Sequence, residues 1–460
     1  MEIMTADEVE RASSGEIICG RQDVSINSVS IDSRKVKKGS LFVAFIGKRV
    51  DGHNYIEDAF ANGASIALVE KDIVSNNGVI IKTSCSLRAM QSIASHYRQK
   101  FDIPIVAITG SVGKTTTKEI CAAVISSRYK TLKSEGNLNS DIGMPLSVFG
   151  LDSSFEAAVF EMGMTNLGEI SLMSHIARPY IAVITNIGVS HIEKLSSRDN
   201  ILKAKMEIEN GLMSDGVMIL NGDDPLLFSH KNKILHNLVC FGINNEKCEY
   251  RAKDIVYGNN YTEFIVVCPF GEFFARINVL GLHNVYNALA AVCVGLSLGL
   301  SFEEIAEGLL FFRNPVMRQN IKDYNGITII EDCYNASPES MRAALNVLGD
   351  MKKSFKIAVL SDMLELGEHS IEMHKKIGEF AVKKTDYILC FGTNAKYYIE
   401  GAIKAGMKKN RCFHFDDALL CVNKLKEMKG KDKVILFKGS RGMKVEDCMN
   451  KYLEGIKDIG

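Results

Sequence analysis

Apolar residues gather in short runs that alternate with stretches of helical spacing. Between residues 86 and 101, apolar side chains recur three and four positions apart, which predicts an amphipathic helix. Before it, strand-like runs such as 40–47 alternate with helix-like stretches such as 54–64. We therefore expect a small N-terminal α/β domain, residues 1–84, that ends just before this helix. The helix's apolar positions are Leu87, Met90, Ile93, Ala94 and Tyr97.

Uninterrupted apolar runs separated by helical patterns follow from residue 103. Such runs predict a mostly parallel sheet covered by helices on both faces. Two further strands about a tight turn, within 261–280, predict an antiparallel extension of that sheet. We expect a central domain at 85–314. Its four apolar runs are 103–110, 156–163, 180–188 and 216–222.

The pattern is interrupted at Pro315 and then resumes with strands and helices in alternation. This predicts a smaller, doubly wound (Rossmann-like) C-terminal domain at 315–460. The fold class is therefore α/β with three domains. The strands expected in the third domain are 327–332, 355–362, 386–392 and 433–440.

Composition narrows the classes of function. Hydrophobic residues at 46% and charged residues at 24% are typical of globular proteins. Lys and Arg together number 55, as do Asp and Glu, so the chain lacks the broad cationic surface that nucleic acid or an anionic membrane demands. We expect small-molecule partners, no nucleic acid and no membrane insertion.

Cysteines and the N-terminal stretch indicate the compartment. The twelve cysteines contain no C-x-x-C pair, so a zinc site is not indicated and most should be small buried hydrophobes. The first residues are acidic and polar, and nowhere do eighteen apolar residues run together. We expect a cytoplasmic protein with reduced thiols.

The stretch 106–120, VAITGSVGKTTTKEI, carries the most specific chemistry. An apolar strand enters a glycine-containing loop and a helix begins at Lys114, so backbone N–H groups and the helix N-terminus can hold phosphate. The usual first glycine is missing, because Ile108 stands five residues before Gly113. Lys114 would bridge the outer phosphates and Thr115 would reach magnesium. The expected nucleotide-binding residues are Gly110, Ser111, Val112, Gly113, Lys114, Thr115 and Thr116.

A glycine turn before an ordinary helix, with a solvated lysine, is the alternative for this stretch. The strand, the loop, the Lys-Thr-Thr sequence and the amphipathic helix occur together, which favours the phosphate site.

The loop TGSVGKTT, residues 109–116, resembles that of the Mur ligase family and its folylpolyglutamate synthetase relatives, which are ATP-dependent amide-forming enzymes with this shortened spacing. Further blocks resemble the branch of the family that adds D-alanyl-D-alanine to UDP-N-acetylmuramoyl-tripeptide. They span all three expected domains in the family's order, and we expect a monomer that uses ATP and Mg²⁺. The blocks are 134–147, 160–170, 184–193, 281–291, 329–345, 360–370 and 437–446.

Glu161 ends an apolar strand, where a carboxylate beside the phosphate loop would complete a magnesium site. The alternative is that Glu161 is a solvated surface residue. His191 follows another strand end, and the alternative there is a hydrogen-bonded core histidine. The resemblance implies that Glu161 and His191 face two metal ions, and that Lys205 is carbamylated and helps to hold one of them. It thus implies catalytic roles for Lys114, His191 and Lys205, and metal contacts for Thr115, Glu161, His191 and Lys205.

Two asparagines, Asn284 and Asn287, lie near the start of an expected helix, where caps explain such residues. The resemblance implies that they approach the ATP base. Ser337 and Pro338 predict a helix cap with proline at the first helical position. The resemblance also implies that third-domain residues reach the nucleotide, namely Arg318, Asp332, Tyr334 and Asn335.

Asp32, Ser33 and Arg34 resemble the family's uridine-diphosphate anchor, since a hydroxyl and a guanidinium suit uracil and diphosphate oxygens. The neighbouring Lys35, Lys37 and Lys38 are expected to lie in a solvated turn, without a role in binding. Asn137 and Asn139 fall in another block that the resemblance assigns to substrate binding. The residues it places on the dipeptide side of the third domain are Asp362, Glu365, Lys438, Ser440 and Arg441.

The resemblance implies ligation through an acyl phosphate, in peptidoglycan precursor synthesis. Another Mur ligase or a folylpolyglutamate synthetase is the nearest alternative, although the folate enzyme does not explain the long N-terminal span. A phosphate-loop GTPase or kinase is a second alternative, but we find no N-K-x-D motif. A non-catalytic nucleotide-gated protein is the third, and the joint presence of Lys114, Thr115, Glu161 and His191 argues against it.

Overall fold

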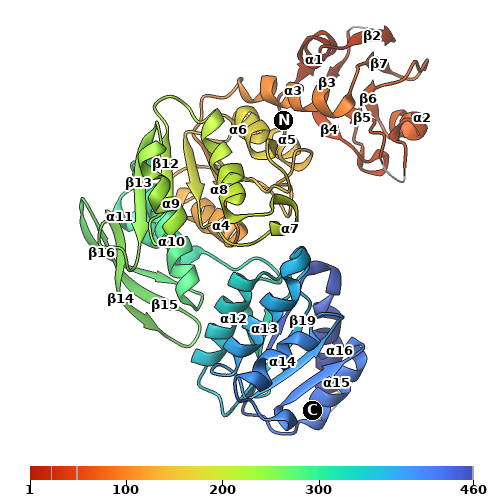
Figure 1. Cartoon of the computed structure of the whole chain (residues 1–460). Coiled ribbons are helices and arrows are strands. Elements are labelled where there is room, and N and C mark those ends of the chain that lie inside the picture. The colour runs from red at the N-terminus through yellow and green to blue at the C-terminus, as the bar shows by residue number, and fades with distance from the viewer. Residues whose placement is uncertain (22, 48–49, 458–460) are drawn as a thin grey trace.

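The computed structural model describes residues 1–21, 23–47 and 50–457. Three α/β units follow one another along the chain, each built around its own larger sheet (Figure 1). The α/β class and the three-part architecture predicted from the sequence are therefore confirmed. None of the helices in the described part of the chain is long and apolar enough to cross a membrane.

The N-terminal unit has a five-stranded sheet, parallel except at the β2–β7 pair. Its buried side chains alternate between two cores: Leu41 packs toward α1 and α3, and Phe42 packs toward α2. Across the sheet the strands are β2 (Glu16–Cys19), β7 (Val79–Lys82), β6 (Ala64–Val69), β5 (Ser40–Val43) and β4 (Ser28–Ser30), with β1 (Met4–Thr5) and β3 (Ser25–Ile26) as a separate pair; the helices are α1 (Ala6–Ser13), η1 (Ser33–Lys35), η2 (Gly52–Tyr55) and α2 (Ile56–Ala61).

The central unit begins with α3 (Ser86–Arg98), the amphipathic helix that the sequence predicts. Its nine-stranded sheet is parallel except for the final three-stranded meander, which confirms the predicted antiparallel extension. The sheet order is β16 (Gly271–Ile277), β15 (Thr262–Cys268), β14 (Tyr250–Tyr257), β13 (Asn237–Gly242), β12 (Val217–Asn221), β11 (Ile181–Ile184), β8 (Ile105–Thr109), β10 (Ala157–Glu161) and β9 (Thr131–Lys133).

Helices cover both faces of this sheet, as continuous apolar strands require. Along β8, Ile105 and Ala107 pack with one set of helices, whereas Val106 and Ile108 pack with the other. The first set is α3, α5 (Gly143–Val148), α6 (Glu169–Ala177) and α8 (Arg198–Met206), and the second is α4 (Lys114–Ile125), α10 (Leu282–Ser297) and α11 (Phe302–Phe311). The remaining helices are α7 (Ile192–Leu195), η3 (Glu207–Gly211), α9 (Pro225–His230) and η4 (Lys231–Lys233).

The C-terminal unit is doubly wound around a six-stranded sheet, parallel except at the β17–β18 pair. The sheet order is β17 (Asn320–Tyr324), β18 (Ile327–Asp332), β22 (Lys433–Lys438), β19 (Phe355–Ser361), β20 (Tyr387–Phe391) and β21 (Cys412–Phe415). One face carries α12 (Pro338–Asp350), α13 (Ser370–Ala381) and α14 (Lys396–Lys404), and the other carries α15 (Ala418–Glu427) and α16 (Val445–Lys457); η5 (Gly367–His369), η6 (Lys409–Arg411) and η7 (Arg441–Met443) lie in loops.

The ends of parallel strands position the chemistry. Glu161 ends β10, and the phosphate loop follows β8, its neighbour in the sheet. In the C-terminal unit, Asp332 and Lys438 end the paired strands β18 and β22. Ligands in such sheets bind beyond the carboxyl ends of the strands. All twelve cysteines are free thiols, and ten are buried, as expected.

Candidate active site

The phosphate loop has the predicted context of a strand, a glycine-containing turn and a helix, with β8 leading to Gly110–Gly113 and α4 beginning at Lys114. Gly110 and Gly113 have φ angles of 148° and 91°, a backbone region that side chains disfavour. A Cβ on Gly110 would overlap Thr185 Oγ1, and one on Gly113 would lie 2.7 Å from Asn287 Oδ1. Both glycines are therefore required by conformation and by close approach.

A residue that the sequence pattern did not single out holds this loop in place. Asn186 accepts from Ser111 N through its backbone oxygen at 3.0 Å and from Val112 N through Oδ1 at 3.0 Å. Its amide donates back to Val112 O at 2.8 Å. Thr185 Oγ1 also donates to Val112 O, at 2.6 Å. Asn186 lies within block 184–193, but only the fold brings it to the loop.

Lys114 is half-buried at the cleft beside the phosphate loop and Lys205 is buried, and the two lie close enough for their charges to repel each other. Lys114 Nζ donates to Gly110 O at 2.8 Å. Burial lowers the pKa of Lys114, opposed by Glu161 and reinforced by Arg318. Lys205 is 2% exposed, and burial together with repulsion from Lys114 holds its pKa well below the ordinary value. The neighbouring Lys203 is exposed, and Lys205 is the one of the two that is buried and interacts with Lys114, although it does not line the cleft.

Glu161 presents a buried carboxylate beside the phosphate loop. Its side chain is buried, and Oε1 accepts from Asn139 Nδ2 at 2.7 Å. Its Oε2 is buried and has no hydrogen-bond partner among the described residues. No group of three or more His, Cys, Asp or Glu residues that could hold a metal occurs in the described ranges. The carboxylate of Glu161 and the hydroxyl of Thr115 line the same cleft. Such oxygen donors fit Mg²⁺, which takes few protein ligands and completes its shell with water and phosphate oxygens.

His191 and Glu365 contact each other across the two larger units. His191 Nδ1 lies 2.9 Å from Glu365 Oε2, and the hydrogen bond from His191 lowers the pKa of Glu365. Both residues have left-handed backbones, with φ of 64° and 63°. The family resemblance implies a metal contact for the histidine and a dipeptide contact for the glutamate, so their pairing brings together two predicted subsites.

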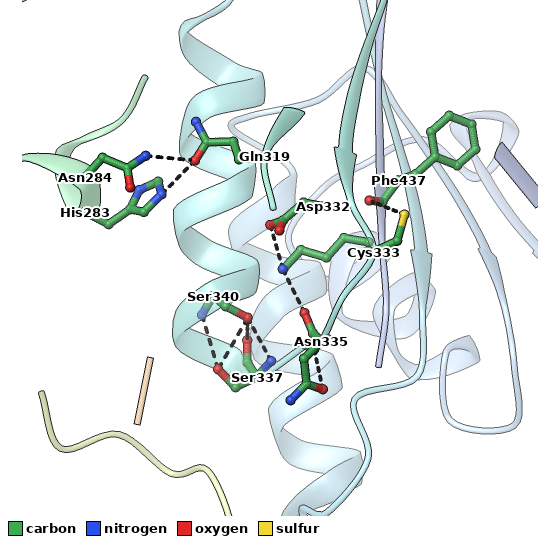
Figure 2. Close-up of polar contacts among 11 residues, drawn as sticks. His283, Asn284, Gln319, Asp332, Cys333, Asn335, Ser337, Ser340 and Phe437 are labelled. Atoms are coloured by element: carbon green, nitrogen blue, oxygen red, sulfur yellow. Dashed lines mark hydrogen bonds and ion pairs between the residues drawn. The ribbon is translucent and has the colours of Figure 1, made fainter. Parts of the chain in front are cut away.

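Asn284 and Asn287 belong to a polar network at the start of α10. Figure 2 shows its His283, Asn284 and Gln319. Asn284 Nδ2 donates to Leu280 O at 2.8 Å and to Gln319 Oε1 at 3.2 Å, while His283 Nε2 lies 2.7 Å from the same oxygen. Asn287 Nδ2 donates to Asn284 Oδ1 at 3.1 Å. Burial lowers the pKa of His283. Gln319, another residue that the sequence pattern did not single out, thus joins the third unit to this network.

The space beside this network is narrow. It measures about 50 Å³, against roughly 300 Å³ or more for a typical small-molecule site. In this conformation the space is too small to hold a nucleotide base. The predicted residues that line it are Val112, Gly113, Thr116, Asn284, Asn287, Arg318, Asp332 and Lys438.

Arg318 reaches the phosphate loop from the third unit. Its Nη2 donates to Thr115 Oγ1 at 3.2 Å, and its guanidinium lies 4.2 Å from the centre of the Tyr334 ring. Lys438 Nζ is buried and donates to Asp332 Oδ2 at 2.7 Å and to Asn335 O at 3.0 Å. Figure 2 labels these two partners, Asp332 and Asn335. The lysine therefore secures the loop that carries Tyr334 and Asn335.

A cleft of about 370 Å³ joins the phosphate loop to the third unit. It brings together more of the predicted residues than any other described cavity, and it is open enough for phosphates and a reacting carboxylate. The predicted residues that line it are Ser111, Val112, Gly113, Lys114, Thr115, Asn137, Asn139, Glu161, His191, Arg318, Tyr334 and Asn335.

None of the five residues predicted on the dipeptide side lines this cleft. Glu365 pairs with His191 and Lys438 lines the narrow space beside Asn284, as described above. The other three make local contacts. The Asp362 carboxylate is buried and accepts from Thr393 N and Asn394 N, each at 3.0 Å. Ser440 Oγ accepts from Leu364 N at 2.9 Å. Arg441 is exposed and pairs with Glu446. These contacts stabilise the loops at the strand ends, and the roles of the three residues toward a substrate stay predictions.

The first unit has a separate pocket of about 800 Å³ lined by Asp32, Ser33 and Arg34, with apolar walls that include Val50 and Tyr55. Asp32 accepts from Arg34 Nε at 2.9 Å and Nη2 at 2.8 Å, and this pairing lowers the pKa of Asp32 to about 2. The Arg34 side chain is 86% exposed, so it can turn to an incoming anion.

Models of known families match most of the chain. The Mur ligase middle domain matches residues 108–295, and the Mur ligase glutamate ligase domain matches residues 317–441. A third model, described as the Mur ligase family catalytic domain, matches residues 25–103.

Two proteins of similar sequence carry the same name. The chain is 38% identical to the UDP-N-acetylmuramoyl-tripeptide--D-alanyl-D-alanine ligase of Bacillus subtilis, over 93% of each chain. It is 33% identical to the ligase of that name from Escherichia coli, over 94% of this chain and 95% of the relative.

Solved structures agree with these relatives. A crystal structure of MurF from Acinetobacter baumannii superposes with a TM-score of 0.91 at 31% identity, covering 99% of each chain. MurF from Thermotoga maritima in complex with ADP gives a TM-score of 0.84 at 28% identity, over 94% of this chain and 98% of that one. With this match in sequence and fold along nearly its whole length, the chain belongs to the Mur ligase family.

Proposed function

We propose that this protein is an ATP-dependent ligase that joins D-alanyl-D-alanine to UDP-N-acetylmuramoyl-tripeptide, with release of ADP and phosphate. The observation that carries the proposal is the cleft in which Lys114, Glu161 and the third unit's Arg318 meet. It occurs in a chain that matches ligases of this name over more than nine-tenths of its length. These relatives favour this function over folylpolyglutamate synthetase or another Mur ligase.

In the proposed reaction the terminal carboxylate of the tripeptide attacks the γ-phosphate of ATP, and ADP leaves. The amine of the dipeptide then attacks the acyl carbonyl, the new amide bond forms and phosphate leaves. Lys114 and the backbone N–H groups of the phosphate loop orient the triphosphate and stabilise charge at the transferred phosphoryl group. No covalent intermediate with the enzyme is needed.

Thr115 and Glu161 are proposed to hold Mg²⁺ with nucleotide oxygens, and His191 to face a second ion. Bound magnesium would neutralise phosphate charge during the transfer. The unpartnered Oε2 of Glu161 supports this assignment. Carbamylation of Lys205 would turn a buried amine into an anion beside Lys114. The lowered pKa of Lys205 favours the uncharged amine, the form that reacts with carbon dioxide.

The units are proposed to divide the work as residues 1–84, 85–314 and 315–460. In the first, Asp32, Ser33 and Arg34 would bind the uridine diphosphate, and the 800 Å³ pocket beside them suits a nucleoside diphosphate. Asn137 and Asn139 would face the growing peptide. In the third, the proposed dipeptide contacts are Asp362, Glu365, Lys438, Ser440 and Arg441.

Around the nucleotide, Asn284 and Asn287 would approach the base, while Arg318 and Tyr334 would close over it from the third unit. Gly110 and Thr116 would complete the phosphate contacts, and Asp332 and Asn335 would support the closing loop. Closure excludes water from the labile acyl phosphate. We further propose that the enzyme acts as a monomer in the cytoplasm.

Phosphate release in the presence of ATP and Mg²⁺ tests the function. UDP-muramoyl-tripeptide and D-alanyl-D-alanine are omitted in turn, and each omission should abolish steady release. Replacing the dipeptide by a free amino acid, or the acceptor by a folate, tests the related ligases. Release that ignores both omissions would contradict the proposal.

A further inference from the structure

Glu339 lies in the first turn of α12, immediately after the cap formed by Ser337 and Pro338. A carboxylate there interacts favourably with the helix N-terminus and is usually solvated. Here the side chain instead reaches the central unit, where Oε1 accepts from Val189 N at 3.0 Å. The two residues are 150 positions apart in the chain, so this bond exists only while the two units are together.

The loop that receives Glu339 connects β11 to α7 and runs past the phosphate loop. Its Gly188 N donates to Ser111 Oγ at 2.8 Å. A Cβ on Gly188 would lie 2.7 Å from both Cδ and Oε1 of Glu339. Gly188 is therefore needed for close approach, and the short stretch 188–191 touches the phosphate loop, Glu339 and, through His191, Glu365.

Only half of the Glu339 carboxylate is satisfied. Its Oε2 is buried and has no hydrogen-bond partner in the described part of the chain. The desolvation cost of a buried carboxylate oxygen without a donor offsets much of the gain from the bond to Val189. The contact therefore adds little net stability, and breaking it costs little free energy.

We propose that Glu339 is a positioning residue that docks on Val189 N–H as the third unit closes and thereby fixes the loop that presents His191 and supports Ser111. This proposal rests on the proposed ligase function for its catalytic consequence. Its structural consequence, an ordered 188–191 loop, does not depend on that function.

Glu339→Ala is the main variant, and Glu339→Gln is the conservative one, because its amide oxygen can still accept from Val189 N. Glu303→Ala is the matched control: Glu303 occupies the same second position after a serine cap, in α11, but is exposed. Gly188→Ala should also break the hydrogen bond between Glu339 and Val189, because the new methyl group would push the Glu339 carboxylate away. Unchanged circular dichroism and thermal midpoints verify that each variant folds.

We expect kcat for ligation to fall about 10-fold or more in Glu339→Ala and Gly188→Ala, with the KM for the UDP substrate unchanged. Glu339→Gln should recover to within about threefold of the parent, and Glu303→Ala should match it. Phosphate released per product formed should rise in Glu339→Ala, because a loosely closed site admits water.

Amide hydrogen exchange measures the loop directly. Backbone amides of 188–191 should exchange about 5-fold or more faster in Glu339→Ala than in Glu303→Ala, with ATP present. Equal exchange and equal kcat in these two variants would overturn the proposal. If the parent enzyme shows no dipeptide-dependent phosphate release, the proposed function fails, and the exchange comparison still decides the role of Glu339.

Discussion

Arg318, in the segment just before β17, donates a hydrogen bond to Thr115 Oγ1 in the first turn of α4, and its guanidinium stacks 4.2 Å from the centre of the Tyr334 ring. One side chain thus connects the third unit to the residue proposed to hold magnesium. Its Nε is buried without a partner among the described residues. A planar, always charged donor in this place suits a phosphate group that enters between the units.

Replacing Arg318 by lysine should therefore impair nucleotide use despite the retained charge. Lysine cannot stack on Tyr334 or present the same donors, and loss of a charged hydrogen bond costs about 1.5–3 kcal/mol, or roughly 10- to 150-fold in kcat/KM for ATP. Steady-state kinetics measure the change. Arg313→Lys is the control, since Arg313 is exposed and bonds only to nearby carbonyls. Equal kcat/KM in the two variants would remove Arg318 from the nucleotide site.

Gly113→Ala tests the close approach of the phosphate loop to Asn287. The new methyl group would suffer from a φ of 91° and from an oxygen 2.7 Å away. Gly299 has a φ of 76° and nothing within 4 Å, so Gly299→Ala isolates the conformational cost. We expect urea unfolding to show a loss of about 1–2 kcal/mol in Gly299→Ala and a larger loss in Gly113→Ala, which adds the steric clash. Only Gly113→Ala should also raise the KM for ATP, and normal ATP use in that variant would contradict the site.

Sequence patterns predicted the elements whose signals are local. Strand β8, the glycines after it and α4 follow from an apolar run, φ preferences and helical spacing, and the hairpin of β15 and β16 follows from two strands about a tight turn. Each of these signals lies within the stretch of chain that forms the element, so the amino-acid pattern alone is enough to predict it.

Contacts between distant segments were not predictable in this way. Asn186 binds Val112 from 74 positions away, and Glu339 binds Val189 from 150. Each looks like an ordinary loop or helix-start residue until the fold brings the segments together. Asp362 was predicted from the family resemblance of its block, but its buried hydrogen bonds to two backbone amides were not. Those bonds form because β19 and β20 end side by side. Chemistry-bearing residues at strand ends can be found from sequence, whereas their partners cannot.

Arg34→Ala should weaken binding of the UDP substrate without changing the binding of ATP. Arg34 is exposed and belongs to the first-unit pocket, not to the cleft at the phosphate loop. We expect the KM for the UDP substrate to rise about 10-fold through loss of charged hydrogen bonds to the diphosphate, with the KM for ATP unchanged. Lys38→Ala, at an exposed lysine nearby, serves as the control. An equal rise in both KM values would place Arg34 elsewhere in the mechanism.

Lys205 allows a test by pH. Its folded-state pKa lies well below the ordinary 10.5, because burial and Lys114 disfavour the charge. The unfolded chain therefore binds more protons in the window below 10.5, and stability should rise with pH there. In carbon-dioxide-free buffer, urea unfolding should show this rise between neutral pH and pH about 9 in the parent and in Lys203→Met, but reduced in Lys205→Met.

Bicarbonate tests whether Lys205 is carbamylated. If Lys205 carries a carbamate, bicarbonate should stabilise the parent and raise its activity. The carbamate is an anion, so it attracts the Lys114 ammonium, which the buried Lys205 amine does not. Lys205→Met should be inactive and indifferent to bicarbonate, whereas the exposed Lys203→Met should respond like the parent. Intact-protein mass measured in bicarbonate, with Lys205→Met as reference, detects the adduct directly. A parent enzyme that is fully active without any adduct would rule out the carbamate and leave Lys205 as a buried neutral amine.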